Sequence, residues 1–112
     1  MLPAQLRLRN PQDFARLRQQ GQVVKHKWML LSYLPNKLPH NRYGVITSKA
    51  IGNAVTRNRT KRQLRAIIRQ LHPHLSPGYD IVIVTRRSVV GKPFHDISRS
   101  VDSLAHQANL IL

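Results

Sequence analysis

Basic side chains follow one another at helical spacing in the segment from Arg57 to Arg69, which reads RNRTKRQLRAIIR. The planar guanidinium of arginine pairs bidentately with phosphate and stacks on nucleobases. A solvated helix face that binds nothing normally mixes acids with bases, because like charges four residues apart repel. No acid lies within this segment. The segment therefore predicts a surface that binds the phosphates of a nucleic acid, and we expect RNA.

The charge of the whole chain supports the same interpretation. Nineteen lysines and arginines face four acids, the formal net charge is +15, and no acid occurs between Asp13 and Asp80. Such one-sided charge favours a polyanionic partner over a merely soluble basic protein. A membrane surface is also polyanionic, but a membrane-bound helix needs its apolar side for lipid, whereas here strands and a second helix compete for that side.

A helical wheel of about 100° per residue divides the basic segment into two faces. An apolar arc centred on Leu64 contains Ile67, Ile68 and Leu71. A polar stripe beside it contains Asn58, Arg62, Arg65 and Arg69. Arg57 projects on the apolar side, where a buried unpaired charge would cost several kcal/mol, so we expect the helix to meet an open cleft there.

The elements that position this helix can be read from local patterns. Asn10 and Pro11 begin a short helix that Gly21 ends, and residues 23–34 read as one strand, bent midway. Residues 43–47 read as a second strand that forms a hairpin with it, and residues 81–84 as a strand buried on both faces. From Pro93 as its first residue, a last helix carries an apolar stripe, made of Phe94, Ile97, Val101, Leu104, Ala108 and Ile111. The order predicts an α+β fold, a small α-β sandwich with a mixed sheet of about four strands, a long basic helix and a C-terminal packing helix.

The string from Lys49 to Arg62 resembles the signature of the bacterial ribonuclease P protein subunit, K-x-x-G-x-A-V-x-R-N-R-x-K-R, and meets all its fixed positions. The Asp-Phe pair in the first helix and the chain length also agree with the family. The resemblance therefore covers nearly the whole chain, although only this string is highly specific. The resemblance implies a left-handed βαβ crossover around the basic helix, although such connections are right-handed in about 98% of cases.

The resemblance also implies a function and a set of contacts. Family members bind a catalytic RNA and assist it in removing the 5′ leader of precursor tRNA, with magnesium held by the RNA-containing holoenzyme and no catalytic residue or cofactor in the protein. The residues expected to meet the RNA are Lys49, Asn53, Arg57, Asn58, Arg59, Lys61, Arg62, Arg65 and Arg69. The residues expected to line a leader cleft between the sheet and the first helix are Phe14, Arg18, Trp28 and Tyr33. Arg18 departs from the family, which often has a second aromatic residue there, so the cleft would be more electrostatic.

Two other functions fit the composition. A small structural protein of another ribonucleoprotein, such as a ribosomal protein, would have the same composition and charge. Only the R-N-R signature separates that alternative from the ribonuclease P subunit. A nuclease with its own active site would use some of the six histidines, but His72-Pro73-His74 lacks metal-ligand spacing and the acids are scattered. We further expect a single domain over residues 1–112 and no obligate protein partner. We expect the protein to be soluble and cytoplasmic, because the chain has no cysteine, signal peptide or membrane span.

Overall fold

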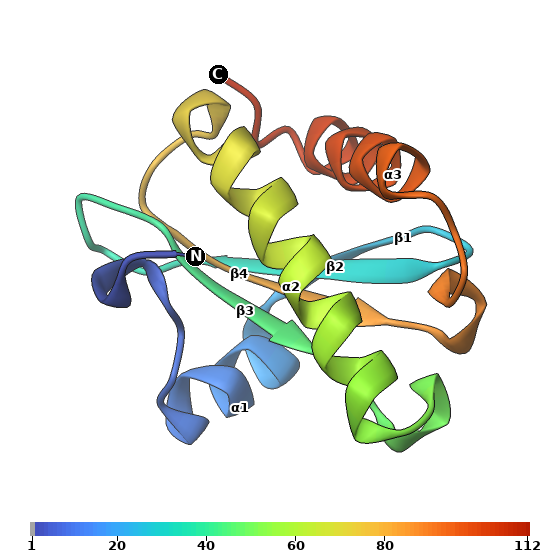
Figure 1. The fold of residues 1–112 in the computed structure, drawn as a ribbon. Helices are drawn as coiled ribbons and strands as arrows, with labels where there is room; N and C mark the ends of the chain where they lie inside the picture. The colour runs from blue at the N-terminus through green and yellow to red at the C-terminus, as the bar shows by residue number, and fades with distance from the viewer. Residues whose placement is uncertain (1) are drawn as a thin grey trace.

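The computed structural model describes residues 2–112, and within them three helices are laid on a four-stranded sheet (Figure 1). The helices are α1 (Pro11–Gln20), α2 (Ala54–Leu71) and α3 (Phe94–Gln107), and the strands are β1 (Gln22–Lys25), β2 (Met29–Pro35), β3 (Arg42–Ile46) and β4 (Tyr79–Thr85). Short 3₁₀ turns precede α1 (Ala4–Leu6), α2 (Lys49–Ile51) and α3 (Arg87–Val89), and another, His72–His74, follows α2. The predicted α+β fold is confirmed.

The strands lie in the order β1-β2-β4-β3. β1 pairs antiparallel with β2, β2 antiparallel with β4, and β3 parallel with β4, so the sheet is mixed as predicted. Helix α2 connects the two parallel strands, and it crosses the sheet with the left-handed sense that the resemblance implied (Figure 1).

Two strand predictions were wrong. Residues 23–34 form two strands, because a tight turn at Lys27 and Trp28 is closed by hydrogen bonds in both directions between His26 and Met29. This turn contains none of the glycine, asparagine or proline residues that usually mark one. β3 does not form a hairpin with β2, because β4 lies between them. The apolar side chains on both faces of β4 favour that central position.

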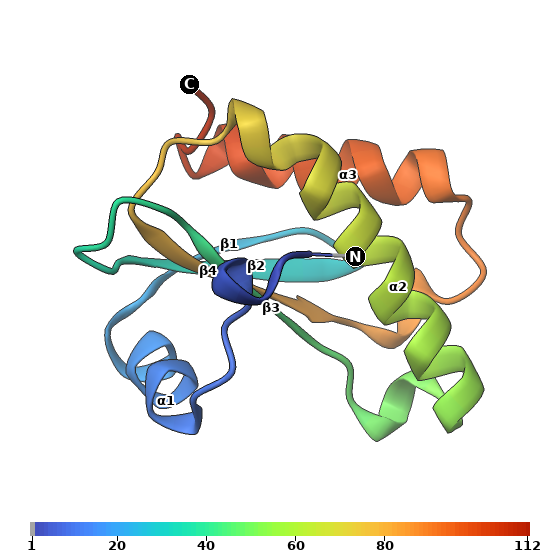
Figure 2. The same cartoon turned by 60° about the vertical axis from the view of Figure 1, so that its left-hand side comes forward.

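The two faces of the sheet are covered unequally (Figure 2). Helices α2 and α3 lie on one face, where Leu31, Ile81 and Ile83 belong to the main core. Helix α1 lies on the other face, where Leu17 and Val82 belong to a smaller cluster with Leu8. Figure 2 shows that α1 covers only part of its face.

Helix α3 packs as its apolar stripe predicts. Ile97, Val101 and Leu104 are each 1% exposed, and Pro93 is the N-cap, so the helix begins one residue later than predicted. The ends of the stripe differ, since Phe94 is partly exposed and Ile111 lies beyond the helix. Within residues 2–112, no helix combines the length and apolar character that crossing a bilayer requires.

Candidate nucleic-acid interface

Helix α2 begins with a defined cap. The Asn53 side chain accepts a hydrogen bond from the backbone N–H of Thr56 at 3.0 Å, which satisfies one of the free donors of the first turn. Gly52 has φ +136°, a conformation that side chains other than glycine rarely adopt, and it turns the chain from the 3₁₀ turn into the helix. Asn53 thus fixes where the helix starts, and Lys49 in the preceding turn is exposed.

The two faces of α2 lie where the wheel placed them. The residues buried against the sheet and α3 are Thr60, Leu64, Ile67 and Ile68. Asn58, Arg59, Arg62 and Arg69 are exposed, whereas Lys61 and Arg65 are half-buried. An open groove of about 460 Å³ runs along this polar side, lined by Val55, Asn58, Lys61, Arg62 and Arg65. Asn58, Lys61, Arg62 and Arg65 therefore meet at one surface.

The first turns of α2 extend past the sheet (Figure 2). Val55 is 75% exposed, and burial begins only at Thr60. The Arg57 side chain is half-buried and makes no hydrogen bond or ion pair with the residues that the structure describes. This placement agrees with the expectation that the apolar arc loses its cover near Arg57. Val55, which also lines the groove, was not among the predicted site residues.

The positive charge of α2 is not neutralised within residues 2–112. None of its arginines or its lysine forms a salt bridge there. The acids that do form ion pairs do so elsewhere, with Arg16, Arg42 and His106 as their partners. The groove thus carries a net positive charge that no side chain within residues 2–112 pairs with.

Two of the four acids hold α1 against the sheet. Asp80 of β4 is fully buried and accepts hydrogen bonds from Arg42 Nε and Nη2, at 2.9 and 2.8 Å, and from Arg16 Nη2 at 3.2 Å. Asn36 Nδ2 donates a further bond at 3.0 Å, and Asp13 of α1 lies 3.3 Å from Arg42 Nη1. The hydrogen bond with Asp80 raises the pKa of Arg42, which therefore stays charged. Sequence reasoning missed this network, although a lone acid beginning an apolar strand was its signal.

Phe14 and Arg18 lie on the sheet face that α1 partly covers. Phe14 packs against the cluster of Leu8, Leu17 and Val82, and it is half-buried. A Cβ on Gly44 would stand 2.8 Å from Phe14 Cε1 and Cζ, so the ring lies directly on the β3 backbone. Arg18 is one helical turn further on and exposed.

Trp28 and Tyr33 are not on that face. Tyr33 pairs with Ile81 in register, so its side chain points to the face that α2 and α3 cover, and its ring stands edge-on to Tyr79 at 6.3 Å between centroids. Trp28, in the β1–β2 turn, also packs against the main core. The structure therefore does not bring the four predicted cleft residues together: Phe14 and Arg18 share a face, and Trp28 and Tyr33 lie on the other. The two-residue alternation of β2 could have separated Tyr33 from Phe14 only if the pairing of the strand had been known.

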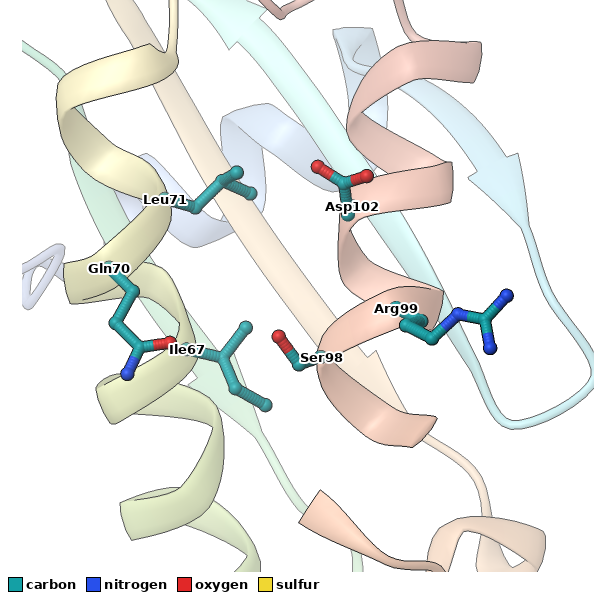
Figure 3. A pocket seen from close by; sticks show the side chains of 6 residues that line it. All are labelled: Ile67, Gln70, Leu71, Ser98, Arg99 and Asp102. Atoms are coloured by element: carbon teal, nitrogen blue, oxygen red, sulfur yellow. The ribbon is translucent and has the colours of Figure 1, made fainter. Parts of the chain in front are cut away.

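A second groove lies between α2 and α3, with Ile67 and Leu71 on one side and Ser98 and Asp102 on the other (Figure 3). The Arg99 side chain points away from α2 in this view, and the groove gathers no set of groups suited to catalysis. Nor do the described residues contain a cluster of three or more histidines and acids that could hold a metal. His72 Nδ1 is 2.7 Å from the buried Tyr43 hydroxyl, and His106 contacts Asp102.

An α+β fold with an uncompensated arginine helix beside an open groove places this chain in the class of nucleic-acid-binding proteins. The ribonuclease P family profile matches residues 2–109, and the chain belongs to that family. The chain is 37% identical over 106 residues to a ribonuclease P protein component of Chloroflexus aurantiacus (94% of this chain, 78% of the relative). It is 36% identical over 104 residues to one of Caldanaerobacter subterraneus (93% and 90%). The RNase P protein of Staphylococcus aureus superposes with a TM-score of 0.88 at 27% identity, covering 96% of this chain and 98% of that chain. The family resemblance stated from the sequence is confirmed, and the ribosomal alternative is not favoured.

Proposed function

We propose that this chain is the protein subunit of a ribonuclease P, that it binds the catalytic RNA through α2, and that it holds the 5′ leader of precursor tRNA beside α1. The observation that carries the proposal is the groove along α2, in which Lys61, Arg62 and Arg65 gather without an acid. Together with membership of the family, this groove favours the RNA of that enzyme over other polyanions.

The geometry of α2 suits a folded RNA. Exposed guanidinium groups along one side of a straight helix can contact successive phosphates, and the amide of Asn58 adds a neutral donor and acceptor among them. Arg57, Arg59 and Lys49 extend the positive surface around the start of the helix, whereas Arg69 extends it toward the other end. Asn53 contributes through the cap that fixes the start of the helix.

The leader, a single strand, needs a stacking surface and positive charge rather than groove readout. Phe14 offers a half-buried ring, and Arg18 offers a guanidinium next to it. Ile46 and Val84, whose side chains lie on the same sheet face, are only partly buried. The Asp80 network holds α1 at this position and so fixes the width of the surface. Trp28 and Tyr33 are left out of the proposed leader contacts because they point to the opposite face.

In this proposal, the protein contributes binding and the RNA contributes catalysis. The described residues do not offer a carboxylate and histidine set that fits magnesium, so no metal ligand is assigned to the chain. Magnesium in the holoenzyme would polarise the scissile phosphate and activate water from sites on the RNA. The protein's own residues would neutralise RNA charge and orient the leader. We place the complex in the cytoplasm and propose no obligate protein partner.

Reconstitution tests the proposal. The purified chain is mixed with the RNA subunit of a bacterial ribonuclease P, and cleavage of a precursor tRNA is followed at limiting magnesium. We expect the chain to raise cleavage at the mature 5′ end only when the RNA subunit is present, and to tighten binding of precursor tRNA more than of mature tRNA. Cleavage by the chain alone, or equal effects on both tRNAs, would contradict the proposed division of work. Binding to ribosomal RNA with no effect on cleavage would favour the ribosomal alternative.

A further inference from the structure

Trp28 stands among cations at one end of the molecule. The Lys27 and Lys92 ammonium nitrogens each lie 5.4 Å from the centroid of its ring, and the His26 ring meets it edge-on at 5.1 Å between centroids. Lys27 and Lys92 are exposed, whereas Trp28 is half-buried and packs against the main core with part of its surface. Two like charges are thus held near one aromatic ring.

An open groove of about 280 Å³ adjoins this ring. It is lined by His26 and Trp28 from the β1–β2 turn and by Asp96, Arg99, Ser100 and Ser103 from α3. Asp96 is its one acid, and Arg99, Lys27 and Lys92 together exceed that charge. We call His26, Lys27, Trp28, Lys92 and Arg99 the Trp28 cluster.

The environment of His26 also reports a positive potential. Desolvation lowers the pKa of His26, and the charges of Lys27 and Arg86 lower it further. Its Nδ1 accepts a hydrogen bond from the backbone N–H of Trp28 at 3.2 Å, which holds the ring beside the indole. Positive charges that disfavour a further proton at this point would be relieved by a bound anion.

The Trp28 cluster continues the surface of α2. A groove of about 220 Å³ is lined by Thr56, Arg59 and Gln63 of α2 and by Val90, Gly91 and Lys92 of the loop before α3. Lys92 therefore lines this groove and also contacts the Trp28 ring. Figures 1 and 2 both place the β1–β2 turn, the start of α3 and the N-terminal half of α2 at the same end of the molecule. A chain of phosphates that leaves α2 at Arg59 can thus reach Trp28 without crossing an acidic surface.

We infer that the Trp28 cluster is a second RNA contact, which takes an unpaired nucleotide with its base against the Trp28 ring and its phosphate near Lys27 and Lys92. This inference rests on the proposed function, because it extends the α2 interface. An aromatic ring beside flexible ammonium groups is the arrangement that binds single-stranded nucleic acid without sequence preference. The contact lies on the opposite sheet face from Phe14, so it is separate from the proposed leader surface.

Trp28 is the single tryptophan of the chain, so its fluorescence reports on this site alone. The full chain is titrated at low salt with a short unstructured RNA oligonucleotide, and both emission and acrylamide quenching are followed. We expect the RNA to quench Trp28 and to protect it from acrylamide. Polyglutamate of similar charge should do neither to the same extent, because it has no base to stack. Equal responses to both polymers would show a general anion surface and overturn the inference.

Substitutions separate this contact from α2. Lys27→Gln with Lys92→Gln changes only exposed side chains, and we expect it to weaken oligonucleotide binding at the Trp28 signal by roughly fivefold or more. Arg62→Gln, outside the cluster, should leave the Trp28 response unchanged while weakening binding of the RNA subunit. Because Trp28→Leu removes a packed ring, it is used only with anisotropy of a labelled oligonucleotide after its fold has been checked. If the lysine variant binds the oligonucleotide and is quenched as the parent is, the inference fails. Failure of the proposed function would appear differently, as an unchanged affinity of Arg62→Gln for the RNA subunit.

Discussion

The α2 groove makes a quantitative prediction for Arg62 and Arg65. In the double variant Arg62→Gln, Arg65→Gln, two of the three cations that line the groove lose their charge, and both replacements keep a polar side chain of moderate length. Arg62 is exposed and Arg65 half-buried, so solvent screens the first contact more than the second. A charge-assisted contact of this kind contributes about 1 kcal/mol after that discount. The pair should therefore account for roughly 2 kcal/mol, or about a 30-fold loss of affinity for the RNA subunit.

The salt dependence gives a second measure of the same contacts. Each phosphate neutralised by the protein releases counterions, so losing two contacts should lower the slope of log affinity against log salt concentration by about 2. Anisotropy of a labelled RNA subunit, titrated over a series of salt concentrations, yields both the affinity and the slope. Because the substituted side chains lie outside the core, the free energy of unfolding in urea should change by less than about 0.5 kcal/mol.

Lys37→Gln is the matched control. Lys37 is exposed in the loop between β2 and β3, so the variant loses one unit of net charge without touching α2. We expect it to leave the salt slope nearly unchanged, since a distant charge acts only through a screened field. If the double variant keeps the parent slope, or if Lys37→Gln lowers it as much per charge, the RNA is not bound along the groove and the reasoning is refuted.

Three further predictions concern stability and the leader surface. Asp80→Asn should lower the free energy of unfolding in urea by about 3 kcal/mol, because it removes the charge of a fully buried carboxylate that two partly exposed guanidinium groups contact. Asp102→Asn, at an exposed pair, should change it by less than about 0.5 kcal/mol, and equal effects of the two variants would contradict the role of the Asp80 network. Gly44→Ala should displace the Phe14 ring, weakening binding of leader-bearing precursor tRNA but not of the RNA subunit, at a stability cost of about 1–3 kcal/mol. Burial raises the pKa of Tyr43 above its ordinary 10.0, so the folded state holds the hydroxyl proton more tightly than the unfolded state does. The free energy of unfolding should therefore fall as pH rises beyond 10.0. The urea midpoint of Tyr43→Phe should fall less over the same range.

The Asp80 network links these experiments, because it joins the stability of the fold to the leader surface. Arg42 donates two hydrogen bonds to Asp80 from β3, and Arg16 donates one from α1. In a chain with four acids, two of them serve to fix α1 on the sheet rather than to neutralise α2. Because the acids that form ion pairs do so away from α2, the arginines of α2 have no intramolecular ion pairs within residues 2–112.

Much of the candidate site was predictable from local sequence. The apolar arc of Leu64, Ile67 and Ile68 and the polar stripe beside it depend on a 3.6-residue period that needs no tertiary information. Asn53 was expected only as an RNA contact, and its role as the N-cap came from the structure. The absence of acids between Asp13 and Asp80 is likewise a sequence property, and it predicted a polyanionic partner. The ribonuclease P signature lies in one continuous stretch, so the family could be identified without the fold.

Only the tertiary structure decided which faces meet. Sheet pairing is non-local. The pairing of β2 and β3 with β4, which lies between them, decides which side chains of β2 and β3 lie on the sheet face that α1 covers. That register separates Tyr33 from Phe14, although both are aromatic residues near the predicted cleft. The turn at Lys27 and Trp28, closed by backbone hydrogen bonds rather than by turn-forming residues, brings Trp28 beside Lys92, far along the chain. Local periodicity thus determined the basic helix, whereas contacts between distant segments determined what lies around it.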